Sequence, residues 1–185
     1  MANTTATRSA GSVWAIDPAH TTVEFTVRHM MIAKVRGRFT GVEATIHEAE
    51  RAGDSALEAV IQVESISTGD EKRDGHLKSA DFFDVENHPE MRFRSTKVVP
   101  VAGNRFRVEG DLTIRGVTRP VALDVKEEGR ARDPWGGERA GFSAKTRINR
   151  KDFGLEWNVA LETGGFLVGD DVDIHIEAEA VLQDD

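Results

Sequence analysis

The sequence predicts an all-β protein, an extended eight-stranded antiparallel β-barrel. Apolar residues alternate with charged or polar residues, most clearly over residues 106–114, 140–148 and 172–182. This period of two is typical of strands that bury one face and expose the other. The alternation recurs along the chain, so we expect a sheet that curls and closes on itself.

A second observation is the mixture of large and small residues on the expected inward face. Phe106 shares this face with Gly110, and Phe142 shares it with Ala140 and Ala144. Small inward residues leave room, so the barrel is expected either to enclose one ligand or to be packed with side chains. An enclosed cavity would favour an apolar ligand, because each buried methylene contributes ~0.8 kcal/mol.

The elements expected in the first half of the chain follow this alternation. Its strands are Trp14–Asp17, Thr21–His29, Lys34–Glu48 and Ala56–Ser67. In the third strand the apolar positions change parity at Gly41, which predicts a bulge or bend. Residues 70–80 break the alternation and predict a short helix. Leu77, Phe82 and Phe83 are expected to pack this segment over one end of the barrel.

The second half is expected to return to strands after Pro89. Residues 104–115 and 117–127 predict a hairpin that turns at Arg115–Gly116. Two further strands are expected at 138–149 and 170–182, separated by an irregular glycine-rich segment.

Length and composition suit one globular domain, expected over residues 12–185 and preceded by a disordered tail over residues 1–11. The tail has no apolar core of the kind found in secretory signals, so we expect a cytoplasmic protein. A periplasmic or secreted location is expected instead if a signal has been removed. No apolar run approaches the ~18 residues that suggest a transmembrane segment.

The net charge of −8 argues against nucleic acid as a general partner, because phosphate binding needs a concentrated positive surface. The chain has no cysteine and none of the common nucleotide-binding, hydrolase or metalloprotease motifs. We see no pair of carboxylates on an apolar strand face that would indicate acid–base chemistry. No catalytic residue, metal ligand or cofactor is therefore predicted.

Two groups of basic residues are candidates for the mouth of the barrel. One contains Lys34, Arg36 and Arg38, and the other contains Lys145, Arg147, Arg150 and Lys151. They could meet an anionic head group or a membrane surface, although ordinary solvated strand faces explain them equally well. The apolar segments 30–32 and 157–167 could gate an opening, form a dimer contact or pack against the barrel end.

The ordered motifs of this chain resemble those of the YceI-like family. The motifs are Trp14–Phe25 (WAIDPAHTTVEF) with His29, Gly37–Phe39, His76–Phe83 with Pro89, Phe93–Ser95, Gly110–Val121, Arg150–Gly154 and Val168–Val172. The resemblance covers nearly the whole chain after the tail. It implies a lipocalin-like barrel that binds polyisoprenoids, isoprenoid quinones or similar amphiphiles in its interior, and it implies no catalytic residues.

These observations lead to a predicted ligand site inside the barrel, with the apolar chain along its walls. The predicted site residues are Phe25, Val27, His29, Phe39, Phe93, Phe106, Phe142, Ile174 and Ile176. His29 enters the set because it is in phase with Phe25 and Val27, and the head group is expected near it or near a basic residue at the mouth.

Two other functions are kept as alternatives. The first is an enzyme acting on a small amphiphile, with His29 and a buried carboxylate as acid and base. The second is an interaction module built on a solid barrel. A homodimer is compatible with each of these hypotheses.

Overall fold

The structure is a computed structural model that describes residues 11–184, so residues 1–10 of the predicted tail lie outside the described part. Its strands are β1 (Ser12–Ile16), β2 (Thr22–His29), β3 (Ala33–Phe39), β4 (Val42–Glu48), β5 (Ala56–Gln62), β6 (Ile66–Ser67), β7 (Glu90–Ala102), β8 (Arg105–Ile114), β9 (Val117–Arg132), β10 (Glu138–Asn149) and β11 (Val168–Leu182). The helices are α1 (Glu71–Lys78) and the short 3-10 turns η1 (Pro18–His20), η2 (Ala52–Asp54), η3 (Val63–Ser65) and η4 (Arg150–Phe153).

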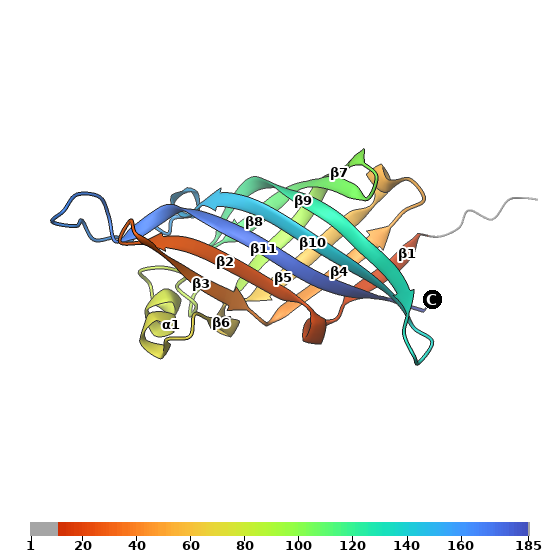
Figure 1. The fold of residues 1–185 in the computed structure, drawn as a ribbon, viewed down its shortest axis with the longest axis horizontal. Coiled ribbons are helices and arrows are strands. Elements are labelled where there is room, and N and C mark those ends of the chain that lie inside the picture. The colour runs from red at the N-terminus through yellow and green to blue at the C-terminus, as the bar shows by residue number, and fades with distance from the viewer. Residues whose placement is uncertain (1–10, 185) are drawn as a thin grey trace, which may run out of the picture.

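The strands form one closed antiparallel barrel (Figure 1). β1 and β2 both pair with β11, and β4 and β3 pair with β1 and β2 in turn. β5 then pairs with β4, and β6 pairs with β3. Three long, interrupted strands result, made of β1 with β2, β3 with β4 and β5 with β6. With β7 to β11 they make eight, and the predicted eight-stranded antiparallel barrel is confirmed.

The interruptions have local causes. Pro18 occupies the first turn of η1, and the Asp17 side chain caps that turn by accepting a hydrogen bond from the Ala19 amide (3.0 Å). Between β3 and β4 the chain bends at Gly41, where an added Cβ would lie 3.0 Å from the Gln62 Cβ. The parity change at this glycine therefore corresponds to a real bend in the strand.

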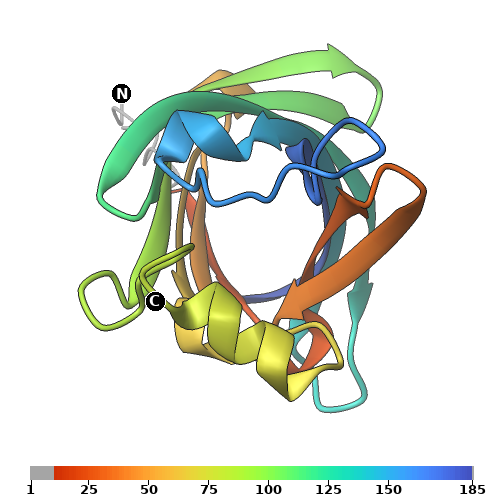
Figure 2. The same ribbon diagram turned by 90° about the vertical axis from the view of Figure 1, so that its left-hand side faces the viewer.

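The helix and its following loop lie along one side of the opening at one end of the barrel, as Figure 2 shows. Asp70 caps α1 by accepting a hydrogen bond from the Arg73 amide (3.0 Å), and Ser79 ends it. Phe82 is buried in the core, and Leu77 and Phe83 pack against it. We call this end of the barrel the helical end.

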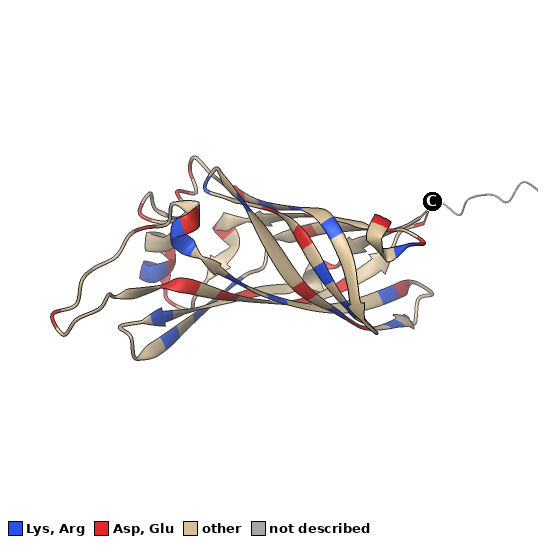
Figure 3. Ribbon diagram, turned by 90° about the horizontal axis from the view of Figure 1, so that it is seen from above, with Lys and Arg blue, Asp and Glu red and all other residues tan. Residues whose placement is uncertain are grey.

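The apolar core lines the barrel in two groups. The larger group extends from the helical end through the middle, and the smaller one surrounds Trp14 at the opposite end with Ala140 and Ala180. Acidic and basic residues occur along the strands around the barrel (Figure 3). Among residues 11–184, no helix has the length and apolar character needed to cross a bilayer.

Candidate ligand cavity

The barrel encloses a cavity of about 460 Å³, within the usual range of small-molecule sites. Every strand except β6 contributes wall residues. The wall extends from Leu77 and Phe83 at the helical end to Trp14, Glu48 and Arg130 at the other end. The cavity is therefore long and mainly apolar, with its charged residues near the ends.

Eight of the predicted site residues lie at this wall, namely Phe25, Val27, Phe39, Phe93, Phe106, Phe142, Ile174 and Ile176. The ninth, His29, is not among the wall residues. It is the last residue of β2, where it pairs with Ala33 at the turn and with Val168 of β11. His29 has the same parity as Val27, which is why the alternation placed it inside, but it lies one inward position beyond this wall residue. Ligand contact by all nine residues stays a prediction.

Small side chains create the free volume. Ala44, Ala59, Ala144 and Ala178 are wall residues on four different strands. Ala144 lies opposite Ile176 on one side and Val125 on the other, so a larger side chain there would fill the space between them. The interior is hollow, and the alternative of a solid barrel loses its structural basis.

A charged network lies at the end of the cavity opposite α1. The Arg130 guanidinium donates hydrogen bonds to the carboxylates of Glu48 and Glu127. The Trp14 indole donates to Glu48 Oε2 (2.8 Å), and Arg130 Cζ lies 5.1 Å from the Trp14 ring centroid. The hydrogen bonds from Arg130, together with the one from Trp14, lower the pKa of the Glu48 carboxyl despite its partial burial.

This network corrects the expectation that no carboxylate pair lies on an apolar strand face. Glu48 continues the inward series of Ala44 and Ile46, and Glu127 continues that of Leu123 and Val125. Extending the period-two count to the strand ends would have found both carboxylates. The inward position of their partner, Arg130, is harder to predict from the sequence. A bulge opposite Gly141 and Phe142 brings Arg130 to the same face as Glu127.

The geometry does not support acid–base chemistry between His29 and these carboxylates. His29 ends β2 beside the β2–β3 turn, whereas Glu48 and Glu127 lie at the opposite end of the cavity. The two carboxylates are also bound by Arg130. The acid–base pair of the enzyme hypothesis is therefore not assembled.

Arg150 has a structural position rather than the exposed one expected at the mouth. Its side chain is only 5% exposed and donates hydrogen bonds to the backbone carbonyls of Leu155, Trp157, Val168 and Gly169. Burial lowers its pKa from the ordinary value. The guanidinium fastens both ends of the segment between η4 and β11, so it is not free to bind a head group.

The other predicted mouth residues are more exposed. Arg147 is paired with Asp173 of β11 through its Nε (2.7 Å), on the outer face of the sheet. Lys34, Arg36 and Arg38 are exposed positions on β3. Their role as head-group contacts stays a prediction.

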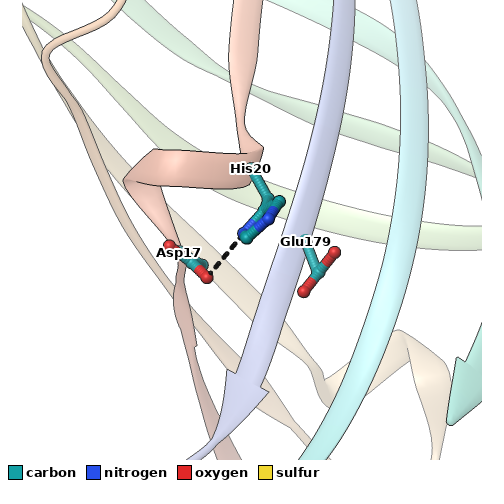
Figure 4. Close-up of side chains that lie close together, drawn as sticks. All are labelled: Asp17, His20 and Glu179. Atoms are coloured by element: carbon teal, nitrogen blue, oxygen red, sulfur yellow. Dashed lines mark hydrogen bonds and ion pairs between the residues drawn. The ribbon is translucent and has the colours of Figure 1, made fainter. Parts of the chain in front are cut away.

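A second charged cluster lies where η1 interrupts the first strand (Figure 4). His20 Nδ1 is 3.0 Å from Asp17 Oδ2, and Glu179 lies beside them. The hydrogen bond with His20 and then that from Arg139 lower the pKa of Asp17 to about 2, and the bond with Asp17 raises the pKa of His20. Arg139 also bridges Asp17 and Glu179, so the cluster is an ion-pair network that holds the turn.

Comparison with known proteins then identifies the family. The YceI-like domain matches residues 14–180, which is most of the chain. This chain belongs to the YceI-like family. A UPF0312 protein of Staphylococcus aureus is 36% identical over 169 residues, covering 90% of the YceI-like chain and 95% of the relative.

Two solved structures place this YceI-like barrel among known folds. The Campylobacter jejuni YCEI protein has a TM-score of 0.70 at 30% identity, over 85% of this chain and 90% of that one. A polyisoprenoid binding domain from Saccharophagus degradans, implicated in plant cell wall breakdown, has a TM-score of 0.65 at 17% identity. It covers 92% of this chain and 98% of its own, and at this identity it shows the shared fold.

Proposed function

We propose that the barrel binds one long-chain isoprenoid lipid or isoprenoid quinone, and that it stores or carries this ligand without converting it. The observation that carries the proposal is the long apolar cavity of about 460 Å³. Its walls contribute hydrophobic contact along the barrel, which suits an extended hydrocarbon chain. Family membership and the polyisoprenoid-binding description of the Saccharophagus degradans domain support the same ligand class.

Four of the charged groups at the cavity wall also favour binding over catalysis. Arg130 is shared between Glu48 and Glu127, and Arg150 is fully engaged with backbone carbonyls. None of these groups combines a free acid with a nearby free base, as proton transfer would require. They are better suited to shaping the ends of an apolar tunnel.

Trp14 allows a direct test, because its indole lies at the cavity wall and is 3% exposed. A Trp135→Phe/Trp157→Phe variant retains Trp14 as its only tryptophan. Titration with a long-chain isoprenoid quinone should quench this fluorescence to saturation at one quinone per chain. Native mass spectrometry should show the same one-to-one complex.

Two neighbouring substitutions on β11 distinguish the cavity from the outer surface. Ala178→Phe places a ring inside the cavity and should weaken quinone binding about ten-fold or more, since overfilling an occupied space is costly. Glu177→Phe adds the same ring on the exposed face and should leave the affinity unchanged. Equal affinities for the two variants, or no quenching of the parent, would refute the proposed function.

A further inference from the structure

Most exposed large apolar side chains gather at the helical end of the barrel. Of the seven such residues within 11–184, five lie in the β2–β3 turn and in the segment between η4 and β11. Their exposed fractions are 43% for Met30, 58% for Met31, 81% for Ile32, 46% for Val159 and 53% for Phe166. We call these five residues the apolar rim.

The two parts of the apolar rim are held together. The Met30 amide donates a hydrogen bond to the Leu167 carbonyl (2.8 Å), and the Leu167 amide donates to Val159 (2.9 Å). The Met31 side chain lies against Gly165, where an added Cβ would be 3.1 Å from its sulfur. Both segments project from the barrel at the helical end (Figures 1 and 2), so the rim residues lie on two neighbouring loop tips.

The β2–β3 turn has a strained backbone that barrel formation does not require. Met30 and Met31 both have positive φ angles, 52° and 65°, and the Ile32 amide closes the turn on the His29 carbonyl (3.2 Å). Turns with two successive positive φ angles favour Asn-Gly, and a methionine there is strained. Strain combined with exposed apolar side chains indicates that the turn serves a purpose outside the barrel.

We propose that the apolar rim inserts into the surface of a lipid bilayer and places the helical end of the cavity against it. This proposal rests on the proposed function, because a water-insoluble ligand has to pass between the cavity and a lipid phase. The wall residues Val27 and Val168 lie just inside the rim, on β2 and β11, so the docked surface and the cavity are adjacent. Met, Ile and Phe side chains are the kinds that enter the interfacial region of a bilayer.

A bilayer fits this surface better than a second copy of the chain. The rim consists of five side chains on two loop tips, whereas a stable protein interface takes about 20–30 residues on each side. Two convex tips would also leave most of each other exposed. A fluid lipid surface, in contrast, closes around a small convex group.

Charges around the rim indicate which kind of bilayer it accepts. Lys151 lies near Phe166, with its Nζ 5.9 Å from the ring centroid, and exposed Lys34 follows the β2–β3 turn. Exposed Glu156 and Glu162 lie in the segment between η4 and β11, so the two signs are mixed around the rim. We therefore expect insertion driven by apolar side chains, with phosphatidylcholine bilayers sufficient and little dependence on anionic lipid.

The test is co-flotation of the full chain with phosphatidylcholine vesicles. Ile32→Glu/Phe166→Glu should weaken partitioning about ten-fold or more, because burial of one such side chain alone contributes about that factor. The matched control is Val101→Glu. The Val101 side chain is 66% exposed and lies at the C-terminal end of β7, away from the helical end of the barrel. Ile32→Leu should retain parental partitioning, since it keeps the apolar surface.

Three outcomes would overturn docking through the apolar rim. The first is absence of parental flotation, and the second is equal loss in Val101→Glu or in Trp135→Ala, which removes the 86% exposed indole at the other end. The third is a parental dimer that the rim variant converts to monomer without any change in flotation. Quinone titration separates the two proposals. A rim variant that loses flotation but keeps quinone quenching of Trp14 supports docking. A parent that shows no quenching refutes the proposed function, whatever its flotation.

Discussion

The ring of Phe25 occupies the space that a side chain on Gly37 would need. The two residues are opposite each other on β2 and β3, and a Cβ built on Gly37 would lie 2.2 Å from Phe25 Cζ. Gly37 is buried, and its other close neighbour is the Thr68 methyl group. The glycine therefore sets the position of one aromatic wall residue of the cavity.

Gly37→Ala should lower the free energy of unfolding by about 1–3 kcal/mol, because the Phe25 ring and the Thr68 methyl group have to shift to admit the new Cβ. The displaced ring should also weaken quinone binding. Urea denaturation and Trp14 quenching measure the two effects. A variant as stable as the parent would show that the ring has room to move.

Gly75→Ala provides the matched control. Gly75 lies inside α1, and an added Cβ would meet nothing within 4 Å. The same methyl group should here raise the free energy of unfolding by about 0.5–1 kcal/mol, because alanine favours the helix. Opposite signs for the two glycine variants would separate steric crowding from backbone entropy.

Met30→Asn/Met31→Gly should stabilise the fold and weaken vesicle binding together. Relief of the two positive-φ methionines should raise the free energy of unfolding by about 1–2 kcal/mol. Urea denaturation at constant slope measures this gain. A loss of stability would mean that packing of Met31 on Gly165 outweighs the backbone strain.

The Asp17–His20 interaction should give a pH-dependent contribution to stability. The pKa of Asp17 falls from 3.8 to about 2 on folding, so its contribution is present above pH 3.8 and is lost towards pH 2. The pKa of His20 rises above 6.5, so its contribution is present below pH 6.5 and is lost as pH rises through the folded value. The interaction is therefore strongest between about pH 4 and 6.5.

Asp17→Asn should lower the pKa of His20, which an NMR titration of its ring protons measures. The stability difference from the parent should be larger at pH 5 than at pH 8, because His20 is charged at the lower pH. A histidine pKa unchanged by the substitution would contradict the assigned contact between Asp17 Oδ2 and His20 Nδ1.

Arg150→Met should release the segment between η4 and β11. Loss of the guanidinium leaves several backbone carbonyls without their donor, and we expect a drop of about 2–4 kcal/mol in the free energy of unfolding. Amide hydrogen exchange should accelerate over residues 154–169. The neighbouring Lys151→Met, whose side chain is 43% exposed, should cost at most about 1 kcal/mol.

Strand periodicity accounts for most of the wall. Phe25, Phe142 and Ile174 were assigned to the interior by parity alone, because successive side chains of a strand point to opposite faces. His29 has the same parity but lies at the end of β2, outside the set of wall residues, so its contact with a ligand stays a prediction. The count was not extended to Glu48 and Glu127 at the strand ends, and both are wall residues.

The sequence by itself determined the barrel, the inward face of each strand and the small residues that leave space, because these depend on neighbours only a few residues apart. Tertiary structure alone decided that Arg130 meets Glu48 across 82 residues, that Arg150 binds carbonyls at both ends of the segment that follows it and that two apolar loops meet. Those contacts depend on bulges, strand register and barrel closure, which long-range packing sets rather than the order of adjacent residues.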